Sequence, residues 1–105
     1  MKEKKYYRIL TKYGKMKKTE IVSDCKEIKI LKIRFIIFEE HIQKHKDWFG
    51  KYVIVHLETG LMAGYGNSKK SAIEMVKERL QEFPDAIKNE KAKLTKGGFE
   101  IPVNI

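Results

Sequence analysis

The run Gly64-Tyr65-Gly66-Asn67-Ser68-Lys69-Lys70-Ser71-Ala72 places a pair of lysines directly after two glycines, at the expected start of a helix. The first turn of a helix presents unpaired N–H groups and a partial positive charge, and both favour a phosphate group. Lys77 follows Lys70 by seven residues and falls on the same stripe of that helix. We therefore predict Lys69, Lys70 and Lys77 as phosphate contacts.

Two further groups of basic residues extend this prediction. Lys32 and Arg34 fall on the polar side of an alternating segment and are expected on a sheet face that no helix covers. A second cluster surrounds the first predicted turn, and it contains Lys12, Lys15, Lys17 and Lys18. We expect Lys17 and Lys18 to extend the phosphate-binding surface. The alternative is a solvated loop.

The overall charge also indicates an acidic partner. The 105 residues include 23 Lys and Arg against 14 Asp and Glu, for a formal net charge of +9. Only Arg8, Arg34 and Arg79 are arginines, and a lysine ammonium acts as a point charge without the bidentate fork that reads bases. Contact with the nucleic-acid backbone is therefore favoured over sequence reading. The competing interpretation is codon bias of an AT-rich genome, which raises Lys and Ile without any ligand.

Residues of catalytic type do not form a recognisable active site. His41 and His45 would share a helix face, but a zinc site needs further ligands, and none is identifiable. Cys25 has no evident base, and Ser68 lacks the strained turn of a hydrolase nucleophile. We predict that the protein is not an enzyme and that it uses no metal or cofactor.

The single cysteine and the polar N-terminal sequence favour a reducing cytoplasmic location. The longest apolar run, near Ile33–Phe38, is interrupted by Arg34 and is too short to span a bilayer, so no membrane anchor is expected. Trp48 and Phe49 follow a polar connector. They are expected to fill the edge of the core or, if exposed, to anchor a protein partner.

The residue patterns in the N-terminal two thirds of the chain predict β-strands. A first hairpin is expected from residues 6–12 and 18–23 around a turn at 13–16, and a single long strand from 27–38. A second hairpin pairs 52–58 with 61–65 through Thr59-Gly60. A final edge strand at 99–103 tolerates Pro102 and could pair with a second copy; the oligomeric state stays open.

Helical periodicity begins after Asn67. The apolar stripe consists of Ala72, Ile73, Val76, Leu80 and Phe83. Ser68 or Asn67 is the expected cap, with Ser71 and Glu74 as an alternative capping pair. Pro84 ends or kinks the helix before a weaker helical segment at 85–94. These elements predict one α+β domain over residues 1–105, with an antiparallel sheet of about four or five strands and one main C-terminal helix packed on one face.

Residues 64–80, with the pattern G-x-G-x-S-K-K-x-A, resemble the start of the last helix in double-stranded RNA-binding domains. The resemblance implies that Lys69 and Lys70 contact phosphates across the major groove. The order strand, strand, helix with a G-x-S/T motif also resembles small antitoxin-type domains, in which the equivalent segment serves protein contacts.

Two functions follow as hypotheses. The first is a small basic nucleic-acid-binding module, for RNA or DNA, that contacts phosphates with little sequence preference. The second is a protein-interaction or inhibitor module of the type encoded by phages and mobile elements, such as anti-CRISPR and antitoxin-like proteins. Such an inhibitor would act on a nucleic-acid-handling enzyme, and its basic face would occupy that enzyme's acidic surface or bound guide RNA.

Overall fold

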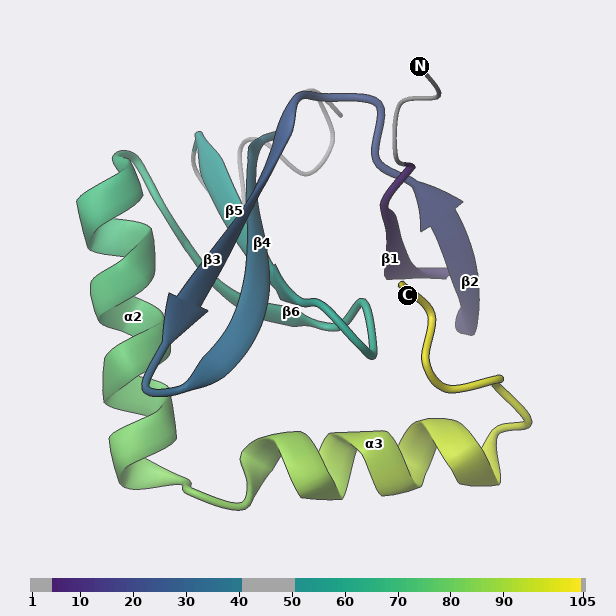
Figure 1. Ribbon diagram of the computed structural model, residues 1–105. Helices are drawn as coiled ribbons and strands as arrows, with labels where there is room; N and C mark the ends of the chain where they lie inside the picture. The colour runs from purple at the N-terminus through teal and green to yellow at the C-terminus, as the bar shows by residue number, and fades with distance from the viewer. Residues whose placement is uncertain (1–4, 41–50, 105) are drawn as a thin grey trace.

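The computed structural model describes residues 5–40 and 51–104, which form an α+β fold as predicted. The strands are β1 (Tyr7–Lys12), β2 (Lys15–Glu20), β3 (Cys25–Ile30), β4 (Ile33–Glu39), β5 (Tyr52–His56) and β6 (Met62–Gly66), and the helices are α2 (Lys69–Glu82) and α3 (Ala86–Lys96). An antiparallel sheet has the order β3-β4-β5-β6, and β1 pairs with β2 in a separate two-stranded sheet. Figure 1 shows α2 and the β1–β2 hairpin on opposite sides of the four-stranded sheet.

The single strand predicted over residues 27–38 is wrong, because the chain reverses at Leu31 and Lys32. Both residues have positive φ, 49° and 70°, as in the two-residue turns that fit the twist of a hairpin. β3 and β4 then pair from Ile30↔Ile33 to Cys25↔Phe38. No Gly, Asn or Pro marks this turn, and it shows in the sequence only as a change of phase in the apolar alternation, from Ile28 and Ile30 to Ile33 and Phe35. Lys32 therefore lies in a turn, and only Arg34 lies on a strand.

The sheet carries a hydrophobic core on each face. One core joins Phe35, Ile37 and Ile54 to residues of α2, namely Ala72, Val76 and Leu80. The other core contains Ile21, Ile36, Phe38, Val53, Val55 and Leu57, with Tyr6 packed against it. None of the described helices covers this second face, as expected, but the face is not open to solvent. Consecutive apolar residues in β4 and β5 need burial on both faces, and the N-terminal segment supplies the second cover.

The first hairpin is confirmed, with a tighter turn than predicted. Tyr13 and Gly14 adopt φ values of 52° and 75°, and β2 begins at Lys15 instead of Lys18. The base of the hairpin is anchored by the ion pair between Arg8 and Glu40, whose side chains are both almost fully buried. Arg8 also lies over the Phe38 ring, 4.9 Å from its centroid. This buried pair joins β1 to the residue that follows β4.

Asn104 provides a second anchor for β1. Its Oδ1 accepts a hydrogen bond from the Tyr7 N–H (2.6 Å), and its Nδ2 donates to the carbonyl oxygens of Tyr7 and Leu57. One amide side chain thus replaces the backbone partners that a neighbouring strand would supply. The predicted edge strand at 99–103 does not form, although the Val103 N–H bonds the Glu58 carbonyl oxygen. The C-terminal segment instead holds the hairpin base.

The two helices begin and end close to the predicted positions. Ser68 caps α2 by accepting a hydrogen bond from the Ser71 N–H, and the Ser71 hydroxyl accepts one from the Ser68 N–H. Phe83 was predicted on the buried stripe, but it is 60% exposed because the helix ends there. α3 crosses below the sheet in Figure 1 and buries Leu94. None of the described helices is long and apolar enough to cross a membrane.

Candidate nucleic-acid interface

The two glycines before α2 serve packing between β6 and the helix. A Cβ atom at Gly64 would lie 2.6 Å from Val76 Cγ2, and one at Gly66 would lie 2.7 Å from the Ala72 backbone nitrogen. A side chain at either position would push β6 away from α2. The two glycines that precede the lysine pair are therefore accounted for by this close approach.

Replacing Gly66 by Ala should lower the free energy of unfolding by about 1–3 kcal/mol, because the added methyl group meets helix backbone that cannot yield. Gly97→Ala is the matched control, since its Cβ would meet only ordinary contacts at 3.5 Å and its φ is −77°. Urea denaturation measures both. Equal stability of the two variants would contradict this role for Gly66.

The exposed surface of α2 carries charges of both signs. Lys70 and Lys77 are exposed, but Glu74 and Glu78 lie between and beside them at helical spacing. Lys69 lies over the Tyr52 ring, with its Nζ 5.9 Å from the ring centroid. Carboxylates three and four residues from the lysines weaken the field that a phosphate would meet. The positive potential at the start of α2 is therefore weaker than its lysines alone would produce.

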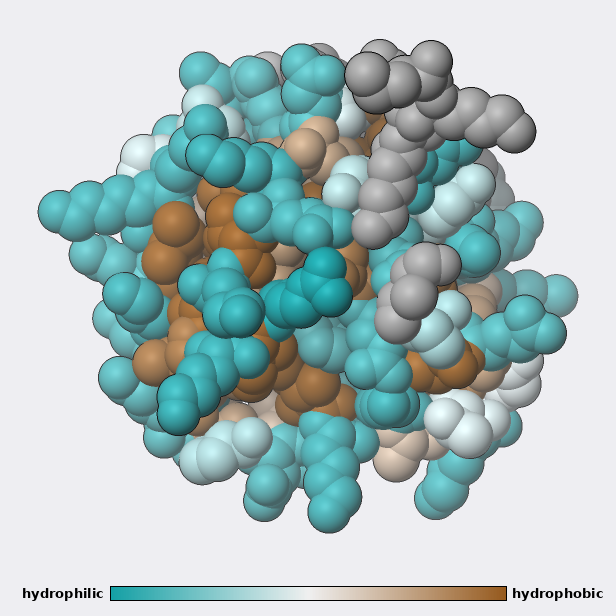
Figure 2. Space-filling view, in the orientation of Figure 1, coloured by the Kyte–Doolittle hydropathy of each residue, from teal (hydrophilic) through white to brown (hydrophobic). Residues whose placement is uncertain are grey.

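Lys32 and Arg34 do not join the helix lysines in one surface. Arg34 lies on the sheet face opposite α2 and pairs with Glu27 at 3.0 Å. Figure 1 places the turn that contains Lys32 beside the C-terminal half of α2, whereas Lys69 and Lys70 begin the helix. Figure 2 shows hydrophobic side chains gathered between α2 and β3. Partly buried residues that pack against the core of α2 and the sheet include Ile28, Ile33 and Ile73.

The β1–β2 hairpin has the strongest local excess of positive charge. Residues 5–20 contain six Lys or Arg and one acidic residue, Glu20. Lys15, Lys17 and Lys18 are exposed, and no carboxylate of the described residues lies within ion-pair distance of them. Glu20 lies at the end of β2 away from the turn, 3.9 Å from Lys5. The predicted contacts Lys17 and Lys18 thus belong to a surface without interleaved carboxylates.

Two large side chains accompany these lysines near the turn. Tyr13 is 92% exposed and Met16 is 39% exposed. Lys18 lies over the Tyr7 ring, with its Nζ 4.4 Å from the centroid, which fixes the direction of that side chain along the hairpin. We refer to Tyr13, Lys15, Met16, Lys17 and Lys18 as the hairpin surface. Sequence reasoning identified its lysines but ranked them below the helix start.

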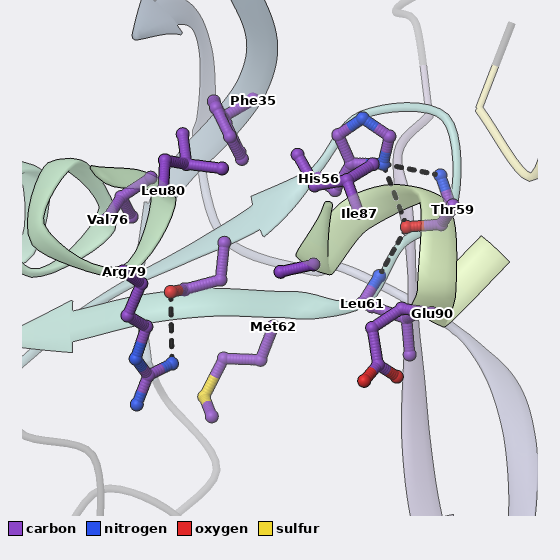
Figure 3. Close-up of a pocket in the computed structure, with 12 residues that line it drawn as sticks. Phe35, His56, Thr59, Leu61, Met62, Val76, Arg79, Leu80, Ile87 and Glu90 are labelled. Carbon is purple, nitrogen blue, oxygen red and sulfur yellow. Dashed lines mark hydrogen bonds between the residues drawn. The ribbon is translucent and has the colours of Figure 1, made fainter. Parts of the chain in front are cut away.

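A separate cleft lies between the β5–β6 hairpin and the two helices (Figure 3). Its volume is about 310 Å³, and its walls are mainly apolar, with Phe35, Met62, Val76, Leu80 and Ile87 among them. At its edge, Arg79 donates a hydrogen bond to the Ala63 carbonyl oxygen at 3.0 Å. Glu90, which also lines the cleft, lies 3.5 Å from Lys93 Nζ, so both of these charged side chains have partners within the protein.

His56 forms part of the wall of this cleft and is held neutral. The Thr59 N–H donates to its Nδ1, and the Thr59 hydroxyl lies 2.9 Å from the same atom. Because a backbone N–H can only donate, Nδ1 must carry a lone pair, and the neutral ring keeps its proton on Nε2. Burial lowers the pKa of His56, while nearby Glu58 opposes the shift. Protonation would therefore cost both solvation and these hydrogen bonds.

This lowered pKa predicts a pH dependence of stability. The unfolded chain takes up a proton near the ordinary value of 6.5 and the folded chain only at lower pH. The contribution of His56 is therefore complete above 6.5 and declines as the pH falls from 6.5 toward the folded-state pKa. Urea denaturation should show that the wild type loses stability as the pH falls through this range. The loss should be smaller in His56→Asn, which has no ionisable ring and whose amide oxygen can accept a hydrogen bond from Thr59. Identical pH profiles would contradict this account.

The thiol of Cys25 is not activated in the described part of the chain. Burial and the charge of Asp24 raise the pKa of the Cys25 thiol to about 11, and its Sγ donates to the Ser23 carbonyl oxygen, so the thiol stays protonated at neutral pH. Within residues 5–40 and 51–104 no three acidic, His or Cys side chains group as a metal site requires. His41, His45, Trp48 and Phe49 lie outside the described residues.

Comparisons of this chain with protein-family models, with characterised proteins and with solved structures find no match.

Proposed function

We propose that the protein is a small non-enzymatic nucleic-acid-binding module that holds the phosphate backbone through the lysines of the hairpin surface. The observation that carries this proposal is the exposure of Lys15, Lys17 and Lys18 on one hairpin that has no carboxylate among them. Codon bias alone gives no reason for lysines to gather on a hairpin tip without acidic residues, whereas the lysines of α2 lie among glutamates.

Binding of this kind is electrostatic. Each lysine that neutralises a phosphate releases condensed counterions, so affinity falls steeply as salt rises. Lysine offers a mobile point charge without a fixed fork, so little sequence preference is expected. Lys69 and Lys70, at the positive end of α2, form a second and weaker place for phosphate because Glu74 follows them by one turn. A cytoplasmic location belongs to this proposal.

The test is a fluorescence anisotropy titration of labelled single- and double-stranded DNA and RNA. The protein should bind at about 50 mM salt and lose most of its affinity at about 200 mM, since the three phosphate contacts of the hairpin lysines alone make affinity fall about fortyfold over that range. Affinity that is absent at low salt, or that is unchanged between the two conditions, would remove the proposal.

An inhibitor of a nucleic-acid-handling enzyme would present similar charge to a protein partner. Recovery of partners from host lysate with and without nuclease treatment separates the two functions. Nuclease-sensitive recovery supports direct binding to nucleic acid. A stoichiometric protein partner that survives nuclease treatment, together with no affinity for the labelled nucleic acids, would favour the inhibitor.

A further inference from the structure

The β1–β2 hairpin has a buried base and an exposed tip. Arg8 and Ile9 near the base are 3% and 7% exposed, whereas Thr11 and every described side chain from Tyr13 to Lys18 are exposed. The ladder continues through Thr11↔Met16 and Lys12↔Lys15 to the two-residue turn. The tip is therefore a regular two-stranded ribbon that extends into solvent and carries the exposed Lys15, Lys17 and Lys18.

The lysines lie on both faces of this ribbon. Successive residues of a strand point to opposite faces, so Lys15 and Lys17 share one face while Lys18 occupies the other with Met16. The position of Lys18 over the Tyr7 ring agrees with this assignment, because Tyr7 pairs with Glu20 on the same face as Lys18. A ribbon that lay flat on one backbone would use cations on one face only. Cations on two faces suit a ribbon with a phosphate strand on each side.

We propose that the tip of the β1–β2 hairpin enters the major groove of B-form duplex DNA, with Lys15 and Lys17 facing one backbone and Lys18 facing the other. This inference rests on the proposed function and names the nucleic acid that the hairpin surface takes. The major groove, about 12 Å wide and about 8.5 Å deep, admits a two-stranded ribbon. From Leu10 to Tyr13 the ribbon extends by about 10 Å at the usual rise of a strand, which matches that depth.

The form of the groove decides between the nucleic acids. The major groove of an RNA helix is deep and narrow, and side chains on a ribbon cannot reach along it. A single strand provides one backbone and would engage one face of the hairpin. The minor groove of B-form DNA is about 6 Å wide, so a ribbon with long side chains on both faces would enter it only at the cost of deforming the duplex.

The tip residues suit the floor of a major groove. Tyr13 lies at the turn and would face the floor, whereas Met16, the other large exposed side chain of the ribbon, shares the face of Lys18 and lies toward the groove wall. Apolar groups in this groove meet the thymine methyl group, and a phenolic hydroxyl can bond base edges that present donors or acceptors. Such contacts add affinity for duplex DNA with only weak preference for sequence.

Two anisotropy measurements test the proposal. The first compares matched DNA and RNA duplexes and single strands at low salt, and duplex DNA should bind most tightly. A DNA duplex whose pyrimidines carry bulky groups at carbon 5 has a filled major groove and should lose binding, whereas a duplex saturated with a minor-groove ligand should keep it. Equal binding to RNA duplex or single strands, or unchanged binding to the filled-groove duplex, would overturn this inference and leave the proposed function standing.

The second measurement removes charge from one face at a time. Each lost phosphate contact lowers the slope of log affinity against log salt by about 0.9. Between about 50 and 200 mM salt, the affinity of Lys15→Gln/Lys17→Gln should therefore fall by a factor about twelvefold smaller than that of the wild type. For Lys18→Gln the factor should be about threefold smaller. Lys26→Gln/Lys29→Gln and Lys29→Gln are the matched controls, with no expected change. An effect confined to one face would contradict the groove geometry. Failure to bind any nucleic acid would instead reject the proposed function.

Discussion

Replacing Glu40 by Leu is expected to lower the free energy of unfolding by about 3–5 kcal/mol, because it leaves the Arg8 guanidinium buried without its counterion. Arg8 Nη1 lies 2.6 Å from Glu40 Oε2, and Arg8 Nε has no hydrogen-bond partner among the described residues. The lost pair is therefore the main compensation for burying this charge. Domains of this size have a total stability of about 5–15 kcal/mol, so urea denaturation will detect the change easily.

The matching control replaces both members of the pair. Arg8→Met/Glu40→Leu removes both buried charges and keeps apolar contact with Phe38, so it should recover most of the stability lost in Glu40→Leu. If the free energy of unfolding of Glu40→Leu lies within about 1 kcal/mol of the wild-type value, the pair contributes no more than an exposed ion pair does. That result would contradict the role of Arg8 and Glu40 as the anchor of the hairpin.

The second large effect concerns the salt dependence of binding. Lys15→Gln/Lys17→Gln/Lys18→Gln should reduce the slope of log affinity against log salt by about 2.7, since each lost phosphate contact removes about 0.9. Over about 50 to 200 mM salt this makes the fall in affinity about fortyfold smaller than in the wild type. The measurement is a series of anisotropy titrations with a DNA duplex at increasing salt.

The helix lysines provide the comparison for this slope. Lys69→Gln/Lys70→Gln/Lys77→Gln removes the same charge from a surface where glutamates already weaken the field. Its slope should change by less than that of the hairpin variant. A larger change in the helix variant would move the interface to the start of α2, as the resemblance to double-stranded RNA-binding domains implied.

Local patterns predicted the elements that depend on near neighbours. The alternation of apolar and polar residues predicted the β1–β2 and β5–β6 hairpins. The Ser68 cap, the apolar stripe and Pro84 predicted α2 and the start of α3. The turn at Leu31 and Lys32 was missed because its residues carry no turn signal, and their positive φ values are imposed by the pairing of β3 with β4. A turn enforced by long-range pairing cannot be recognised from a short window of sequence.

Features that depend on distant contacts were harder to predict. Nothing near Asn104 in the sequence indicates that its amide will bind the Tyr7 backbone, 97 residues away. The continuous apolar runs of β4 and β5 indicate strands that are buried on both faces. This indication was missed because residues 27–38 were interpreted as one long strand with a polar side. The covered sheet face follows from that indication.

The choice of interface illustrates the difference between counting charges and placing them. The pair Lys69-Lys70 stood out because glycines and a helix start surround it, yet those glycines are required by the close approach of β6 and α2. The hairpin lysines stood out less because no motif contains them. Their weight comes from the absence of acidic residues between Lys5 and Thr19, which the sequence already shows, and from the exposure of the hairpin tip, which only the fold shows.

The central claim is that the positive charge on the hairpin, and not net charge in general, holds nucleic acid. It is tested most directly by comparing two variants that lose the same charge, Lys15→Gln/Lys17→Gln/Lys18→Gln on the hairpin and Lys26→Gln/Lys29→Gln/Lys88→Gln elsewhere, in one anisotropy titration of a DNA duplex at low salt. We predict that the hairpin variant loses most of its affinity while the other variant binds nearly as the wild type does. Equal losses in both variants would contradict the account.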